Sequence, residues 1–325
     1  MSASVDVVVS AVGLALPGVE RPEDLLATRR TDVPADPVDP AARLGRRGLR
    51  YKDRATRLAL CAAGDALRDG GFLAAGDGAL SVPATAVGVV ASSNLGNLDT
   101  VCEVASSITA ETTRGISPMA LPNASSNVIS SSVAIKYGLR GPNITLCNGQ
   151  ASGLDAVFWA ARMVAAGRCA SSLVVGVEPR NDVTTRLTGG KDDLLDGAVA
   201  LMVEREDSAR ARGAAVLARL GGYAREKSVA DCLARVLAGA SPAPGIWFVP
   251  ERHTGAGPEG LDRSVPRHDL TDGFGRASGA LGVLQCAAAT AWLATASGFA
   301  LVTCGDDTTD GVAGLVLAGG ERGPG

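Results

Sequence analysis

The sequence is poor in aromatic residues and in histidine. Phe, Trp and Tyr make up 3% of its 325 residues, and the two histidines are His253 and His268. Ala, Val, Leu and Gly must therefore fill the core, which suits close-packed layers of helices and strands with small side chains. A chain of this length buries roughly three quarters of the surface that unfolding exposes, so it can hold a large core.

Membrane spans, secretion signals and metal motifs are also missing from the sequence. No apolar run reaches the ~20 residues of a transmembrane helix, and the N-terminus has no basic segment typical of a signal peptide. The seven cysteines show no C-x-x-C pair or metal-ligand spacing, so we expect small buried thiols in a reducing compartment. A net charge of −3 argues against nucleic acid. We expect a cytoplasmic protein with no cofactor, no metal and no membrane partner.

Continuous Val/Leu runs alternate with helical patterns, and such runs are typical of strands covered on both faces. We expect an α/β protein of two related halves, residues 1–207 and 208–325, that form one compact unit. The expected strands lie near residues 5–13, 86–92, 143–147, 172–178, 198–204, 214–224, 245–249, 299–304 and 312–318. The expected helices lie near residues 54–69, 123–137, 153–166, 228–239 and 277–296.

The most informative segment lies at residues 144–167, ITLCNGQASGLDAVFWAARMVAAG. An apolar run enters a tight turn at Asn148-Gly149, and a long apolar-periodic segment follows, which predicts a strand, a sharp turn and a helix. A side chain at this turn meets the helix N-terminus, whose dipole lowers the pKa of a thiol and stabilises an oxyanion. The turn suits a nucleophile, but Gln150 is a neutral amide and cannot form a thioester. Cys147 lies three residues earlier, on the strand, where we expect its side chain to be packed.

Five segments resemble, in order and rough spacing, the β-ketoacyl synthase family of thiolase-fold enzymes. In the fourth segment a glutamine replaces the cysteine of the family's Cys-x-Ser-Gly. The resemblance implies a thiolase-like fold whose two pseudo-repeated halves form αβαβα layers. The segments are VVVSAVGLALPG (7–18), RATRLALCAAGDALRDGGF (54–72), GLRGPNITL (138–146), QASG (150–153) and DGAVALMVERED (196–207).

The resemblance also implies two catalytic histidines, and both positions are altered in this sequence. The family's His-Gly-Thr-Gly-Thr motif is best matched by residues 252–256, which puts Arg252 at the first histidine, although another register uses His253 itself. The second motif, Gly-His-Thr-Leu-Gly-Ala-Ala-Gly, is matched by residues 275–282, so Arg276 replaces the second histidine. An arginine stays protonated at any working pH and cannot shuttle a proton.

The family's glycine-rich gating loop is also replaced, by residues 304–310, which carry Asp306, Asp307 and Asp310. The resemblance implies that this loop converges with the Gln150 turn and both arginines on one cavity. Two buried arginines without counter-charges would cost several kcal/mol. We therefore expect at least one of Arg252 and Arg276 to pair with an aspartate of the loop.

This combination resembles the chain-length factor, the non-catalytic β subunit of type II polyketide ketosynthases, in which glutamine commonly holds the nucleophile position. The resemblance implies a heterodimer with a catalytic ketosynthase, a tunnel for the growing chain at the interface, and an acyl carrier protein that acts through the complex, as in antibiotic biosynthesis. The expected interface uses residues 143–147 and 123–137. The tunnel and interface candidates are Met119, Leu121, Ser130, Val133, Asn143 and Cys147. The gaps that flank Arg252 are shorter than in the family.

Two other functions stay open. One is a malonyl-carrier-protein decarboxylase of the glutamine-ketosynthase type, although such domains keep both histidines. The other is a stand-alone degenerate ketosynthase-like binding protein. A basic run could meet an acidic carrier protein or could simply be solvated. Its members are Arg43, Arg46, Arg47, Arg50, Arg54 and Arg57.

Overall fold

The computed structural model describes residues 5–27, 36–74, 78–118, 121–190, 193–238, 243–251 and 261–320. In this part of the chain ten strands form one hydrogen-bonded sheet with the order β3-β2-β4-β5-β1-β6-β10-β9-β7-β8. The first five strands are β1 (Val7–Ala15), β2 (Val87–Ser92), β3 (Asn143–Leu146), β4 (Ser171–Glu178) and β5 (Gly197–Arg205). The other five are β6 (Ala218–Glu226), β7 (Ile246–Phe248), β8 (Arg267–His268), β9 (Phe299–Cys304) and β10 (Val312–Gly319).

The two halves of the sheet repeat one another. From the middle outward the first half runs β1-β5-β4-β2-β3 and the second runs β6-β10-β9-β7-β8. In both halves the successive pairs are antiparallel, antiparallel, parallel and parallel. The halves join where Val8 and Val9 of β1 pair with Arg219 and Ala218 of β6. This is the internal duplication that the sequence predicts, while a boundary at residue 207 stays a prediction.

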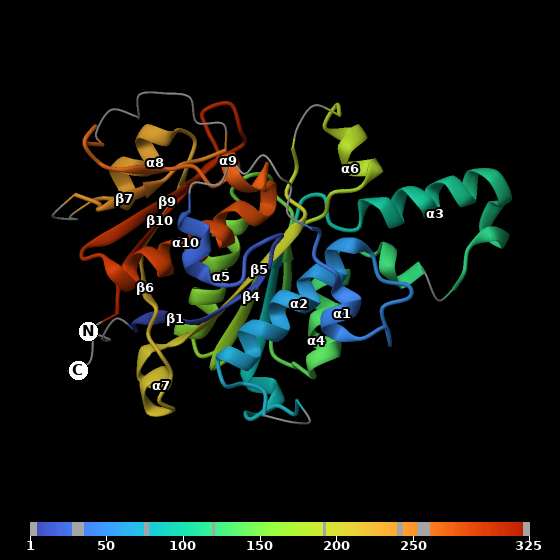
Figure 1. Ribbon diagram of the computed structural model, residues 1–325, viewed down its shortest axis with the longest axis horizontal. Coiled ribbons are helices and arrows are strands. Elements are labelled where there is room, and N and C mark those ends of the chain that lie inside the picture. Colours follow the sequence, from blue (N-terminus) through green and yellow to red (C-terminus); the bar gives the residue numbers. More distant parts are fainter. Residues whose placement is uncertain are drawn as a thin grey trace.

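Layers of helices alternate with layers of strands, from α2 on one side of the protein to α8 on the other (Figure 1). The helices α2 (Arg54–Asp69) and α4 (Val128–Tyr137) pack on the outer side of the first half. The helices α5 (Ser152–Ala165) and α10 (Leu281–Thr295) lie between the two halves and touch strands of both. The helix α8 (Val229–Val236) packs on β6 and β10 at the outer side of the second half. The predicted αβαβα arrangement is therefore confirmed.

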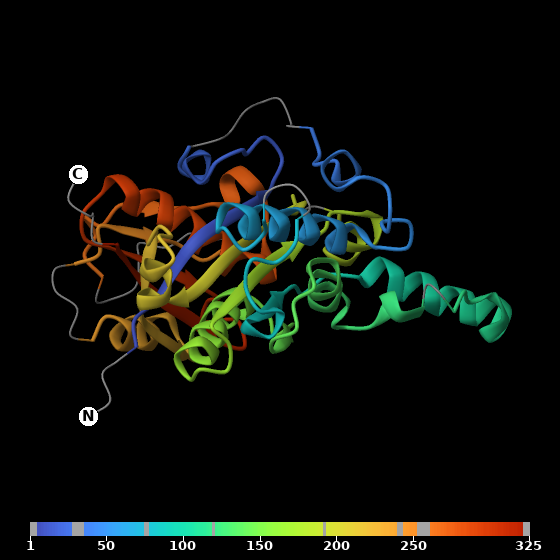
Figure 2. The ribbon, with the colours of Figure 1, turned by 90° about the horizontal axis from the view of Figure 1, so that it is seen from below.

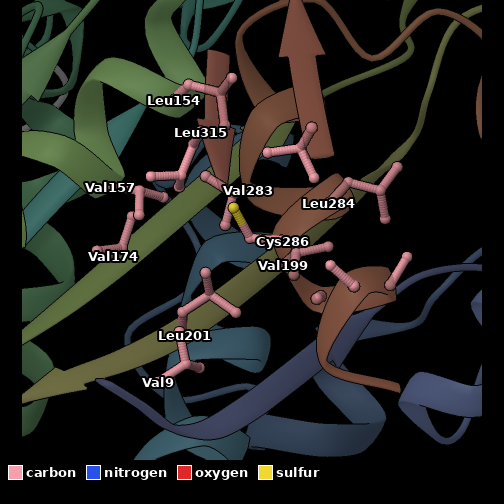
Figure 3. Close-up of a cluster of buried hydrophobic side chains, with 14 of the residues drawn as sticks. Val9, Leu154, Val157, Val174, Val199, Leu201, Val283, Leu284, Cys286 and Leu315 are labelled. Atoms are coloured by element: carbon pink, nitrogen blue, oxygen red, sulfur yellow. The ribbon is translucent and has the colours of Figure 1, made fainter. Parts of the chain in front are cut away.

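The central layer holds the largest core cluster, which Figure 3 shows around α10. Its members are mostly Val, Leu and Ala from α5, α10 and the inner faces of both sets of strands. The helix α10 is apolar on every side, as expected of a helix enclosed between two layers. Small aliphatic side chains therefore fill this core, as expected for a chain with few aromatic residues.

The helix α3 (Leu98–Glu111) was not anticipated from the sequence. It reaches away from the body of the protein in both views (Figures 1 and 2), and none of its residues is buried. The expected helix at 123–137 begins only at Val128, after a 3-10 turn at Leu121–Ala124. The remaining short helices are α1 (Pro40–Leu44), α6 (Asp182–Leu187), α7 (Glu206–Ala211) and α9 (Thr271–Phe274), with 3-10 turns at Pro22–Leu26, Ala84–Ala86, Thr112–Gly115 and Ser278–Ala280. Within the described ranges, none of the helices combines the length and the apolar character needed to span a bilayer.

The backbones of α5 and α10 meet where both helices carry a glycine. A Cβ atom built on Gly153 would lie 2.7 Å from the backbone N of Gly282, and one built on Gly282 would lie 2.4 Å from the backbone N of Leu154. Both of these nitrogen atoms belong to helix backbone, so neither can move unless its helix moves. The two glycines therefore set the separation of the central helices.

We predict that Gly282→Ala lowers the free energy of unfolding by about 1–3 kcal/mol, because overpacking forces a backbone shift. Urea denaturation measures this loss. Gly319→Ala is the matched control, since nothing lies within 4 Å of its Cβ position. Equal urea midpoints for the two variants would show that the close approach is not a constraint.

Candidate functional site

The Gln150 turn has the strand–turn–helix geometry that the sequence predicts. The strand β3 ends at Leu146, Gly149 takes the left-handed φ of +85°, and α5 begins at Ser152. The Ser152 hydroxyl accepts a hydrogen bond of 2.8 Å from the backbone N–H of Asn148, which closes the turn. Gln150 is partly buried, and its Oε1 has no hydrogen-bond partner among the described residues. The turn thus presents an unreactive amide at the start of a buried helix.

Asn94, in the loop after β2, links this turn to the turn before α10. Its Nδ2 donates to the carbonyl of Gly149 at 2.9 Å and lies 2.9 Å from the hydroxyl of Ser278. Its Oδ1 accepts from the N–H of Gly149 at 3.3 Å. Ser278 has a φ of +42°, which is uncommon for a residue with a side chain. One asparagine thus connects the N-terminal turns of both central helices.

Glu178 anchors the Asn94 loop from the end of β4. Its carboxylate accepts from the backbone N–H groups of Asn94 at 2.7 Å, Leu95 at 2.9 Å and Gly279 at 3.0 Å, and from the hydroxyl of Ser93 at 3.1 Å. Complete burial raises the pKa of Glu178 to about 7, and these hydrogen bonds act in the opposite direction. The sequence analysis missed Glu178, although an acidic residue that ends the apolar run SSLVVGVE was a usable signal, since glutamate is rarely buried without partners.

Arg276 pairs with Glu251, which the sequence analysis also missed. The Nε of Arg276 lies 3.5 Å from Oε2 of the buried Glu251, whose Oε1 accepts a hydrogen bond from the N–H of Ser278. Glu251 follows the end of β7 closely, so its side chain meets the turn before α10. Arg276 thus has a carboxylate partner in Glu251. Arg252 lies outside the described residues, so the pairing of at least one of the two arginines with an aspartate of residues 304–310 stays a prediction.

Asp306 and Asp307, in the loop between β9 and β10, make local contacts. Asp306 accepts from the N–H of Thr308 at 2.8 Å, and Asp307 accepts from the N–H of Val229 at 2.7 Å at the start of α8. Asp310 is exposed. Asp306 is thus held by its own loop, and Asp307 is held at the start of α8.

Arg252, His253 and Met119 lie outside the described residues. The second histidine, His268, is on the edge strand β8, with its Nε2 3.2 Å from the carbonyl oxygen of Leu25. Among the described residues, no group of His, Cys, Asp and Glu side chains has an arrangement that could hold a metal ion.

The other interface candidates fall into two groups. Ser130 and Val133 are buried on the inner side of α4, where the Ser130 hydroxyl donates to Oδ1 of Asn143 at 2.7 Å. Leu121 is 49% exposed, and Asn143 is exposed at the start of β3. Their role in a tunnel stays a prediction.

Cys147 is exposed, which corrects the expectation of a packed side chain. The reason is that β3 is the edge strand of the sheet and ends one residue earlier. Partial desolvation, and then the negative charge of Glu178, raise the pKa of the Cys147 thiol, which disfavours the reactive thiolate. Cys102 on α3 is exposed as well, whereas the other five cysteines are buried as expected.

Comparison with known proteins places these features in a family context. Residues 31–188 match the family described as beta-ketoacyl synthase, N-terminal domain. The chain is 30% identical to 3-oxoacyl-[acyl-carrier-protein] synthase 2 of Vibrio harveyi over 164 residues, which are 43% of this chain and 40% of that protein. It is 30% identical to the granaticin polyketide putative beta-ketoacyl synthase 1 of Streptomyces violaceoruber over 206 residues, which are 55% of this chain and 48% of that protein. The matched segment spans half or less of the length of these relatives.

Two solved structures share the fold over nearly the whole chain. The ishigamide ketosynthase/chain length factor has a TM-score of 0.78 at 24% identity, covering 97% of this chain and 100% of its own. A beta-ketoacyl synthase from Burkholderia phymatum STM815 has a TM-score of 0.77 at 17% identity, covering 98% and 100%. At these identities the likeness establishes the thiolase-like ketosynthase fold.

We predict that Arg276→Ala lowers the free energy of unfolding by about 3 kcal/mol, because it leaves Glu251 buried without a counter-charge. Chemical denaturation measures the loss. The double variant Glu251→Gln, Arg276→Met removes both charges and should recover most of it. If the single and double variants were equally unstable, the ion pair would not be what holds this turn.

We predict that Glu178 makes stability depend on pH. The folded pKa of about 7 lies above the ordinary value of 4.5, so the folded protein holds a proton that the unfolded chain releases in this window. Stability from this group is therefore greatest at acid pH and falls as pH rises from 4.5 to 7. Between pH 5 and 8 the wild type should lose about 2–3 kcal/mol relative to Glu178→Gln in urea denaturation. Parallel pH profiles for the two proteins would contradict the assignment.

Proposed function

We propose, from the β-ketoacyl synthase N-terminal domain at residues 31–188 and the ketosynthase fold of the chain, that this protein is a chain-length-factor type of subunit. It pairs with a catalytic β-ketoacyl synthase and shapes the tunnel for the growing acyl chain in type II polyketide biosynthesis. The observation that carries the proposal is Gln150 at the start of α5, where a condensing enzyme needs a thiolate. The activity and the partners are stated here as a proposal, because the match covers only 40% and 48% of the two curated relatives.

The Glu251–Arg276 ion pair supports a non-catalytic role. Glu251 of this pair accepts a hydrogen bond from the backbone N–H of Ser278. The side chain of Asn94 in turn connects Ser278 to the Gln150 turn. A guanidinium held by a carboxylate neither donates nor accepts a proton at neutral pH. A decarboxylase that relies on two neutral histidines therefore fits this arrangement less well.

The exposed side of the first half supports a partner subunit. The strand β3 is an edge strand, whose free N–H and C=O groups invite pairing with another strand. Beside it, Ile135 on α4 is 83% exposed, and Leu121 is 49% exposed on the 3-10 turn that touches both α3 and α4. On α3, Val101 and Ile108 are 40% and 45% exposed. We call these four side chains and β3 the partner surface.

The partner surface suits an obligate pair, which typically buries at least ~2,000 Å² in total. Pairing at β3 would also cover Cys147, which is otherwise an exposed thiol. One solved structure that shares the fold is of a type II PKS acyl-carrier protein in complex with its ketosynthase, and a chain of that complex matches with a TM-score of 0.75 at 15% identity. An approach of the carrier protein through the heterodimer is accordingly part of the proposal.

We predict that co-expression with its ketosynthase gives a heterodimer in analytical ultracentrifugation, and that Ile135→Asp or Val101→Asp weakens it at least about tenfold, because each buries a charge in an apolar contact. Trp159→Ser is the control, since Trp159 is 49% exposed but lies on α5, outside the partner surface. An equal effect of the control, or a monomer at micromolar concentration with the ketosynthase present, would overturn the assembly.

The same preparations test the chemistry. Mass spectrometry of the isolated chain after incubation with acyl-carrier protein should show no acyl adduct, and Gln150→Ala should leave condensation by the heterodimer largely intact. An adduct on Cys147 would contradict the non-catalytic role. Release of carbon dioxide from malonyl-carrier protein by the isolated chain would favour the decarboxylase instead.

A further inference from the structure

A basic cleft lies away from the Gln150 turn, between the segment that leads into α1 and the first turns of α2. Its volume is about 600 Å³. Four arginines line it, Arg46 and Arg50 from the loop that joins the helices, and Arg54 and Arg57 from α2. The run of arginines seen in the sequence thus converges on a concave site rather than spreading over a flat surface.

The charges in this cleft do not balance. Its one lining carboxylate, Asp39, caps α1 by accepting from the N–H groups of Ala41 at 2.8 Å and Ala42 at 3.3 Å. Arg54 is neutralised from outside by a bidentate pair with Asp196, at 3.1 and 2.7 Å. The other three arginines have no carboxylate partner among the described residues.

Arg57 gives the second observation. Its Nε is buried and has no hydrogen-bond partner in the described part of the chain. A buried charged donor without an acceptor is costly, so such a group in a native structure calls for an explanation. The guanidinium to which this Nε belongs lines the cleft, so an anion bound there would lie against a charge that no described carboxylate compensates.

The lining also limits the kind of anion. Arginine forks match phosphate oxygens in bidentate geometry, and uncompensated positive charge favours a dianion over a carboxylate. The lining also includes apolar side chains, among them Val38 and Leu49. A concave site with both features suits a small amphiphilic molecule better than the face of an acidic protein.

We propose that this cleft binds a small phosphate monoester whose organic part is apolar. Arg46, Arg50 and Arg57 hold the phosphate, and Val38 and Leu49 contact the organic group. The site is separate from the Gln150 turn and does not depend on the role proposed for that turn.

The test is calorimetric titration of the full chain with phenyl phosphate and with inorganic phosphate. Phenyl phosphate should bind more tightly, and its affinity should rise from pH 5 to 7.5 as its second proton leaves near pH ~6. Arg50→Gln and Arg57→Gln should each weaken both ligands about tenfold, because each loses a charge-assisted hydrogen bond. Val38→Ala should weaken phenyl phosphate about threefold and leave inorganic phosphate unchanged.

Arg168→Gln is the matched control, since Arg168 is exposed in the loop between α5 and β4. It should bind both ligands like the wild type, and the circular dichroism of all variants should match. No binding at millimolar phenyl phosphate, or an equal loss in the control, would overturn the proposal. It would also be overturned if only an acidic carrier protein, and neither small ligand, responded to Arg50→Gln and Arg57→Gln.

Discussion

The contact of Gly153 with Gly282 is the constraint on which the rest of the structure depends. Because neither residue has a side chain, α5 and α10 approach backbone to backbone between the two halves of the sheet. Each glycine lies within two residues of its helix start, so the contact also brings the two N-terminal turns together. The candidate site is built from these turns. Its geometry is therefore a consequence of core packing, and it persists whatever side chain stands at position 150.

The polar groups around the site serve to hold backbone. Glu178 fixes the loop of Asn94, and Asn94 holds both turns, while Glu251 supports Ser278 in a left-handed conformation that a side chain normally disfavours. Glu178 and Asn94 each make several hydrogen bonds, and Glu251 adds one hydrogen bond and its ion pair with Arg276, so the network is costly to break in part.

Much of the fold could be predicted from the sequence because its strands are continuous Val/Leu runs. The strands near 172–178 and 198–204 were found as β4 and β5, and α2 was placed at its observed bounds. The helix α3 escaped because its apolar residues face solvent, so it lacks the buried stripe on which periodicity arguments rely. Local patterns also could not show that β3 is an edge strand, which is why Cys147 was expected to be packed.

The site was predicted less completely than the fold. The strand, turn and helix around Gln150 were predicted from the sequence, and the structure has that geometry. The assignment of Arg276 to a motif histidine stays a prediction. Arg276 pairs with Glu251 because the end of β7 lies next to the turn before α10. Short sequence motifs do not predict such a contact between distant segments. Glu178 and Asn94 belong to none of the sequence motifs, and their role depends on hydrogen bonds between segments that are distant in the sequence.

The matching strand orders show that the two halves of the sheet repeat one another, and the candidate site is built from one turn of each half. The edge strand β3 leads into α5 as the edge strand β8 leads into α10, so the Gln150 turn and the Arg276 turn are structural twins. Twin positions share a backbone path but carry different chemistry, a neutral amide in one half and an ion-paired cation in the other.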